Sequence, residues 1–161
     1  MASGTTTSPA SVVIDANVVI AICAKEADKL AIAEAKVKEY STSGCRFFAP
    51  GVLFAECLFV FCRKLKDGVF SNADHTGAML AFIKMMANIN PPPNGDANLV
   101  MRAEEIRSSL GCSRSADGIY LALAEKLSKV SSTEVVTFDT GMQSQATASR
   151  LAPAVVVLPI V

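Results

Sequence analysis

The sequence contains few residues that bind transition metals or form disulfides. Its 161 residues include one histidine, His75, and five cysteines, none of which form a C-x-x-C pair. Zinc sites are built from several His and Cys ligands, so these counts argue against a zinc enzyme or zinc knuckle. Because the number of cysteines is odd and their spacing is irregular, a full set of disulfides is also not expected. We expect buried thiols in a reducing compartment.

Net charge and long apolar runs are lacking as well. The 15 basic residues balance 15 acidic ones, which by itself argues against a strongly basic nucleic-acid-binding protein. No apolar run reaches the roughly 20 residues that span a bilayer. The first ten residues, MASGTTTSPA, lack the basic start and apolar core of a secretory signal. We therefore expect a cytoplasmic protein with no membrane partner.

Apolar residues are abundant, at 51% of the chain, which provides a sizeable core and argues against disorder. The length favours one domain. We predict a flexible N-terminal tail over residues 1–10 and a single domain over residues 11–161.

Apolar periodicity divides the chain into alternating strands and helices. Residues 89–96 hold three prolines and predict a loop or at most an edge strand. Residues 140–150 predict a loop or short helix. Ser71 and either Ser113 or Ser115 are expected to cap helices. The predicted strands are 11–15, 45–50, 134–139 and 154–159, and the predicted helices are 16–24, 25–42, 51–68, 72–89, 97–111 and 113–129.

The predicted strands are continuous apolar runs, which is typical of a parallel sheet with helices on both faces. The fold class is therefore α/β, a three-layer α/β/α sandwich around a mostly parallel sheet. In such sheets ligands bind beyond the carboxyl ends of the strands.

Three acidic residues are predicted to lie at that edge of the sheet. Asp15 ends the strand VVID, and Asp139 ends the strand VVTFD. Asp117 falls in the first turn of the helix that leads into the second of these strands. Because a crossover helix runs antiparallel to its strands, its start lies at the same edge, where the helix dipole stabilises an anion.

A fourth acid, Glu56, lies two turns into the helix that follows RFFAP, among apolar helical neighbours. No Lys or Arg lies within nine residues of Asp15, although a carboxylate in an apolar setting needs a partner. A cluster of carboxylates suits a hard cation such as Mg²⁺ or Mn²⁺. The simpler alternative, that each acid is only a cap, a turn residue or a surface charge, stays open for each one taken alone.

These motifs, in this order, resemble those of the PIN domain family, especially its small VapC-like toxin branch. VVIDANVVIA resembles the first motif, with Asp15 and Asn17. FAECLFVF carries a helical acid matched by Glu56, and SRSADGIYLALAEKL is similar to the third motif, with its Asp at Asp117. VVTFD resembles the fourth, matched by Thr137 and Asp139. The stretch after it, TGMQSQATA, is polar where many relatives have an aromatic or apolar residue.

The resemblance implies a three-layer fold and Mg²⁺- or Mn²⁺-dependent cleavage of RNA. It also implies a homodimer and, in the toxin branch, a small antitoxin that blocks the site. Asp15 and Asp117 are expected to bind the metal directly, and Glu56 and Asp139 to bind it directly or through water. Asn17 and Thr137 would orient these groups. The number of metal ions stays open.

Apart from the four acids, the chain has 15 basic and 11 acidic residues. Possible phosphate contacts are Arg46, Lys64, Arg114 and Arg150, all near the ends of predicted elements. The alternative is that they are solvated surface bases. No interleaving of aromatic and basic residues indicates base-specific stacking.

Other protein classes also have an Asp at the end of a strand. A dehalogenase-like phosphatase needs a second Asp two residues after the first, where this chain has Asn17. A receiver domain needs a paired acid and a late lysine, and neither is evident. A PIN-like RNA- or protein-binding module with little or no cleavage is the main alternative.

Two helices, VLFAECLFVFC and AMLAFIKMMANI, carry enough Met and Phe for a dimer face or an antitoxin groove, or for an ordinary core.

Overall fold

The computed structural model describes residues 8–109, 111–112 and 115–160. Within them, five parallel strands form one sheet in the order β3-β2-β1-β4-β5. This confirms the parallel sheet predicted from the continuous apolar runs. The strands are β1 (Ser11–Ile14), β2 (Arg46–Phe48), β3 (Ile89–Asn90), β4 (Thr133–Thr137) and β5 (Ala154–Val157).

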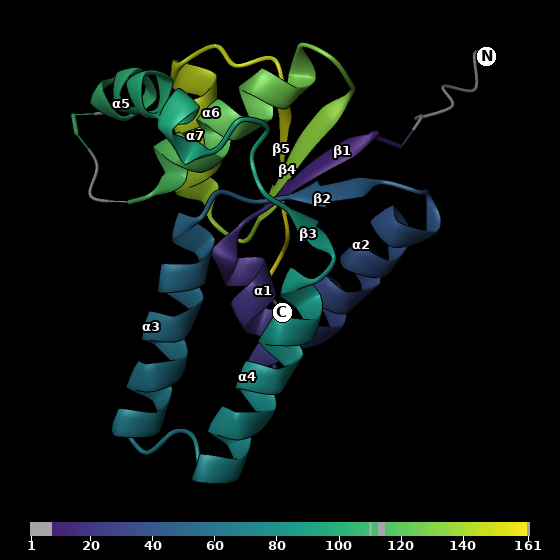
Figure 1. The fold of residues 1–161 in the computed structure, drawn as a ribbon, viewed down its shortest axis with the longest axis vertical. Coiled ribbons are helices and arrows are strands. Elements are labelled where there is room, and N and C mark those ends of the chain that lie inside the picture. Colours follow the sequence, from purple (N-terminus) through teal and green to yellow (C-terminus); the bar gives the residue numbers. More distant parts are fainter. Residues whose placement is uncertain (1–7, 110, 113–114, 161) are drawn as a thin grey trace.

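Helices cover both faces of the sheet, which confirms the three-layer α/β/α fold (Figure 1). Helices α5, α6 and α7 lie together on one side of the sheet, and α1, α2 and α4 lie on the other, while α3 packs on α1 and α4. The helices are α1 (Ala16–Cys23), α2 (Leu30–Thr42), α3 (Val52–Lys66), α4 (Asn72–Met86), α5 (Val100–Ser108), α6 (Asp117–Ser128) and α7 (Thr140–Ala148), with a 3₁₀ helix η1 (Asp96–Leu99) before α5.

The central strand β1 explains where the core and the site lie. All four of its residues are buried, and it pairs with β2 on one side and β4 on the other. Its three apolar residues, Val12, Val13 and Ile14, suit a strand that is covered on both faces. The chain leaves β1 at Asp15 and enters α1 at once. The carboxyl ends of β1 and β4 therefore lie next to the start of α1.

Several boundaries differ from the predictions. The helix predicted from residue 25 begins only at Leu30: Lys25 has a left-handed backbone with φ of 52°, and residues 27–29 form turns. Helix α6 begins at Asp117 with Ala116 at its N-cap, so the prediction that Ser115 caps it is wrong. Ser113, the other predicted cap, lies outside the described residues. Ser71 does cap α4, in a capping box with Asp74.

The two segments with open predictions are also settled. Residues 89–96 begin with the two-residue edge strand β3, and the prolines follow it. Residues 140–148 form α7. Of the predicted tail, residues 1–7 lie outside the described residues, and the Ala10 amide donates to the Ser132 carbonyl at 3.0 Å. None of the helices described is both long and apolar enough to cross a bilayer.

Candidate functional site

Asp15 is held by a hydrogen-bond network that joins the ends of β1 and β4. The Thr137 hydroxyl donates to Asp15 Oδ2 at 2.6 Å. Asn17 Nδ2 donates to that hydroxyl at 3.0 Å, and Asn17 Oδ1 accepts from the Phe138 amide at 3.1 Å. Asp15 occupies the N-cap position of α1 but makes no capping hydrogen bond with its side chain. The network therefore orients the Asp15 carboxylate without neutralising it.

The same threonine fixes the backbone at Asp139. The Asp139 amide donates to Thr137 Oγ1 at 2.9 Å, and Asp139 Oδ1 accepts from the Gly141 amide at 2.7 Å. Asp139 is thus the N-cap of α7, as the simpler alternative from the sequence expected. Its second carboxylate oxygen has no hydrogen bond within the part of the chain that the structure describes. A capping role therefore leaves one Asp139 oxygen for another ligand.

Glu56 reaches the site from α3. Its carboxylate accepts a 2.6 Å hydrogen bond from the Tyr120 hydroxyl, which comes from α6, one turn after Asp117. Tyr120 is only 1% exposed. Its burial and the nearby Glu56 charge raise the pKa of Tyr120, so the phenol remains a hydrogen-bond donor. Arg63, which lies two turns further along α3, pairs with Asp67 and not with Glu56.

Asp117 begins α6 and is held by two neutral side chains. Gln145 Nε2, from α7, donates to Asp117 Oδ2 at 3.1 Å and contacts Ser115 Oγ at 3.4 Å. Burial raises the pKa of Asp117, a hydrogen bond with Ser115 lowers it, and the negative charge of Asp139 raises it again. Asp117 and Asp139 are therefore close enough to repel one another.

The electrostatics link all four carboxylates. Burial raises the pKa of Asp15 from 3.8 to about 7; the hydrogen bond from Thr137 opposes this rise, and the charges of Asp117 and Glu56 add to it. Burial also raises the pKa of Glu56, and the Asp117 charge adds to that rise. The four acids that the sequence places at one edge thus interact through pairwise repulsion.

These carboxylates have no basic partner. Within the described residues, none of the four forms an ion pair with Lys, Arg or His. In the same part of the chain, no three His, Cys, Asp or Glu side chains are grouped so that they could hold a metal ion as they stand. Instead each carboxylate accepts a hydrogen bond from the protein. The donor set fits a hard divalent cation in its chemistry. Binding one would require the carboxylates to turn toward a common point.

Comparison with known proteins gives the family of this fold and site. The family model of the PIN domain matches residues 12–147. The chain belongs to the PIN domain family. The matched range contains all four carboxylates together with Asn17 and Thr137. No curated protein matches the chain.

One solved structure shares the PIN fold over nearly the whole length of this chain. It is the crystal structure of VapBC2 from Rickettsia felis bound to a DNA fragment from their promoter. The TM-score is 0.63 at 10% sequence identity, and the match covers 92% of this chain and 99% of that chain. At this identity the likeness shows the fold alone.

Three of the four predicted phosphate contacts lie within the described part of this PIN domain. Arg46 begins β2, at the end of the sheet opposite to Asp15, and its guanidinium lies over the Phe48 ring. Lys64 lies in the last turn of α3 and pairs with Glu26 at 3.0 Å. Arg150 follows the end of α7. Arg114 lies outside the described residues. Phosphate binding by these bases stays a prediction.

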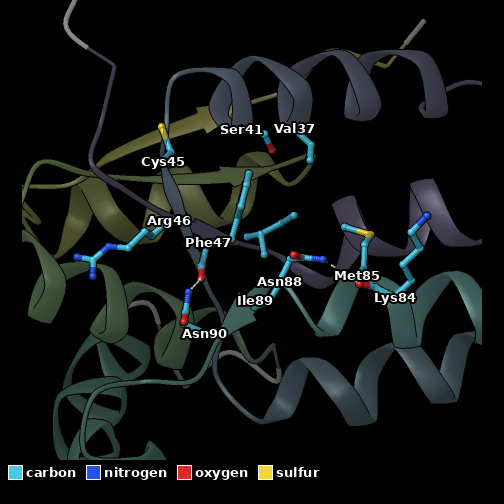
Figure 2. A pocket seen from close by; sticks show the side chains of 11 residues that line it. Val37, Ser41, Cys45, Arg46, Phe47, Lys84, Met85, Asn88, Ile89 and Asn90 are labelled. Carbon is cyan, nitrogen blue, oxygen red and sulfur yellow. Dashed lines mark hydrogen bonds between the residues drawn. The ribbon is translucent and has the colours of Figure 1, made fainter.

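A separate cavity of about 440 Å³ lies between α2, α4 and the β2–β3 edge (Figure 2). None of the four carboxylates lines it. Asn90 closes one side by donating to the Phe47 carbonyl at 2.9 Å, and the Arg46 side chain points away from the space. Its floor is mainly apolar, so it lacks the oxygen ligands of the acidic edge.

Sequence reasoning missed two residues of the site, Tyr120 and Gln145. Tyr120 lies three residues after Asp117, so helical spacing could have placed both side chains on one face of α6. Gln145 lies in the polar stretch that departs from the family pattern, and it is only 4% exposed. The sequence carries no comparable signal for Gln145, because α7 itself was predicted only as a loop or short helix.

Proposed function

We propose that the protein is a metal-dependent ribonuclease that hydrolyses phosphodiester bonds at the edge formed by Asp15, Glu56, Asp117 and Asp139. The observation that carries this is the mutual repulsion of four carboxylates, two just after β1 and β4 and two on α3 and α6, without a basic partner among the described residues. Buried like charges are costly unless a cation offsets them. Membership of the PIN family and the resemblance of all four motifs support the same reaction.

Each residue has a distinct part in this proposal. Asp15 and Asp117 would hold the Mg²⁺ or Mn²⁺ ion directly, with Glu56 and Asp139 completing the set. A bound divalent ion would supply an activated water and offset charge on the phosphate. Thr137 and Asn17 fix the Asp15 carboxylate through their hydrogen bonds, and Tyr120 fixes Glu56.

Metal removal tests this function. A labelled, structured RNA is incubated with the protein in Mn²⁺ or Mg²⁺, in EDTA, and in EDTA followed by excess Mn²⁺. We expect cleavage only with the free divalent ion, and recovery when the ion is restored, because the carboxylates alone offer no activated water. Cleavage that continues at the same rate in EDTA would contradict the proposal. Mn²⁺ binding without cleavage of any RNA would favour the alternative of a binding module.

The proposed biological setting is a toxin–antitoxin pair in which a small antitoxin blocks the site. The shared fold with VapBC2 supports this setting. The hairpin of α3 and α4 also carries large exposed apolar side chains, which are typical of partner surfaces. They are Phe54, Phe59, Leu80 and Ile83, each more than half exposed.

The same apolar surface supports the proposed homodimer. We expect sedimentation equilibrium of the isolated protein at about 100 µM to show a dimer. The favourable free energy of association grows with the apolar area that is removed from water. Phe59→Glu should shift the species toward monomer, while Lys66→Gln, at an exposed position on the same helix, is the control that changes the net charge by the same one unit. A strict monomer at this concentration would contradict the dimer and leave the nuclease proposal untouched.

A further inference from the structure

Gln145 is a buried polar side chain whose hydrogen-bonding groups are only half used. It is 4% exposed and lies on the inner face of α7 beside Met142 and Ala146. Its Nε2 donates to Asp117 and contacts Ser115. Its Oε1 is buried and has no partner among the described residues. A buried acceptor without a donor costs stability, so its presence calls for another reason.

The orientation of the Gln145 amide is determined by its neighbour. If the amide were reversed, Oε1 would face the Asp117 carboxylate and two acceptors would repel one another. The N–H group must therefore face Asp117. The amide is also a neutral donor, so it binds Asp117 Oδ2 without supplying the positive charge that a Lys or Arg would bring.

Helix α7 joins this contact to the other end of the site. Its N-cap is Asp139, whose side chain binds the Gly141 amide at 2.7 Å and so fixes where the helix begins. Two turns later the same helix presents Gln145 to Asp117. The polar stretch that departs from the family pattern thus connects two of the four carboxylates.

We propose that Gln145 is a positioning residue for Asp117. Its Nε2 donates to Asp117 Oδ2 at 3.1 Å, and this contact holds the carboxylate within reach of the negative charge of Asp139. This role assumes that Asp117 binds the metal, so it rests on the proposed function. A purely structural glutamine would instead stabilise the packing of α7 whether or not metal is present.

Gln145→Met separates these roles, because methionine has a similar length and no hydrogen-bonding amide. Mn²⁺ binding is measured by electron paramagnetic resonance, and the melting temperature is measured without metal. We expect the Mn²⁺ affinity to fall roughly 10-fold, with a metal-free melting temperature equal to or above wild type. Gln143→Met, an exposed position on the same helix, is the matched control and should keep wild-type affinity.

A double variant tests whether the effect passes through Asp117. Asp117→Asn alone should weaken Mn²⁺ binding, and adding Gln145→Met should weaken it no further, because the side chain that Gln145 positions no longer acts as a carboxylate ligand. Additive losses, or a lower metal-free melting temperature for Gln145→Met, would indicate general loosening and overturn the role. Wild-type affinity in Gln145→Met would overturn it as well. Absence of Mn²⁺ binding by the wild-type protein would instead refute the proposed function.

Discussion

Asp15→Asn should abolish RNA cleavage while making the metal-free protein more stable. The carboxylate is 7% exposed, and its pKa is about 7 in the folded protein against an ordinary value of 3.8. Asparagine keeps an oxygen that can accept from Thr137 but removes the buried charge. We expect cleavage to fall by more than about 100-fold, because a charged metal ligand is lost. At pH 8 the metal-free protein should gain about 1–3 kcal/mol, or several degrees in melting temperature.

The sign of the pH dependence follows from the raised pKa of Asp15. A folded-state pKa above the unfolded one means that the folded protein binds the proton more tightly. The contribution to stability is then fully present below about pH 4 and is lost as pH rises through about 7. The advantage of Asp15→Asn should therefore be large at pH 8 and small at pH 4.5. Mn²⁺ should raise the melting temperature of the wild type and not that of the variant.

Asp28→Asn is the matched control, since it removes one charge from an exposed position on the loop before α2. It should change the free energy of unfolding by less than about 0.5 kcal/mol at either pH. If Asp15→Asn melted below the wild type at pH 8, Asp15 would be a stabilising structural group rather than a repelled metal ligand.

Gly118→Ala should destabilise the fold strongly, because α5 and α6 approach closely at this position. A Cβ atom on Gly118 would lie 2.6 Å from the Ala103 carbonyl oxygen and 3.5 Å from the Arg107 Cβ. The first neighbour is backbone, so relief requires one helix to move. We expect a loss of about 1–3 kcal/mol. Because Asp117 precedes this glycine, the shift should also weaken Mn²⁺ binding.

Gly77→Ala provides the opposite expectation on α4. Nothing lies within 4 Å of a Cβ at Gly77, and alanine favours a helix by about 0.5–1 kcal/mol over glycine. Denaturant unfolding of the two variants therefore separates a steric effect from helix propensity. Equal stability of Gly118→Ala and wild type would contradict the close approach of α5 and α6.

Much of the fold could be predicted because its signals are local. The apolar runs of β1 and β4, ending in Asp15 and Asp139, predict buried parallel strands and place both acids at one edge. The position of Asp117 in the first turn of α6 was also correct. These inferences need only strand polarity and the antiparallel course of a crossover helix.

The remaining features depend on tertiary contacts. Glu56 could be placed on a helix, but its partner Tyr120 is 64 residues away along the chain. The contact between Gln145 and Asp117 depends on α7. The sequence of this helix has a weak apolar pattern, and the helix is stabilised by its N-cap, Asp139, and by packing. The start of α2 at Leu30 follows a left-handed Lys25, and α6 starts at Asp117 with Ala116 rather than a serine at its N-cap.

The most direct test of the carboxylate site is to determine the ends that cleavage leaves on RNA. Water that attacks the phosphorus and displaces the 3′ oxygen would leave a 5′-phosphate and a 3′-hydroxyl, whereas attack by the neighbouring ribose hydroxyl, which displaces the 5′ oxygen, would leave a cyclic phosphate. The products are mapped for the wild type with Mn²⁺, with Asp15→Asn in parallel. We predict 5′-phosphate ends that require both Mn²⁺ and Asp15. Cyclic phosphate ends, or the same products from Asp15→Asn, would contradict hydrolysis at the four-carboxylate site.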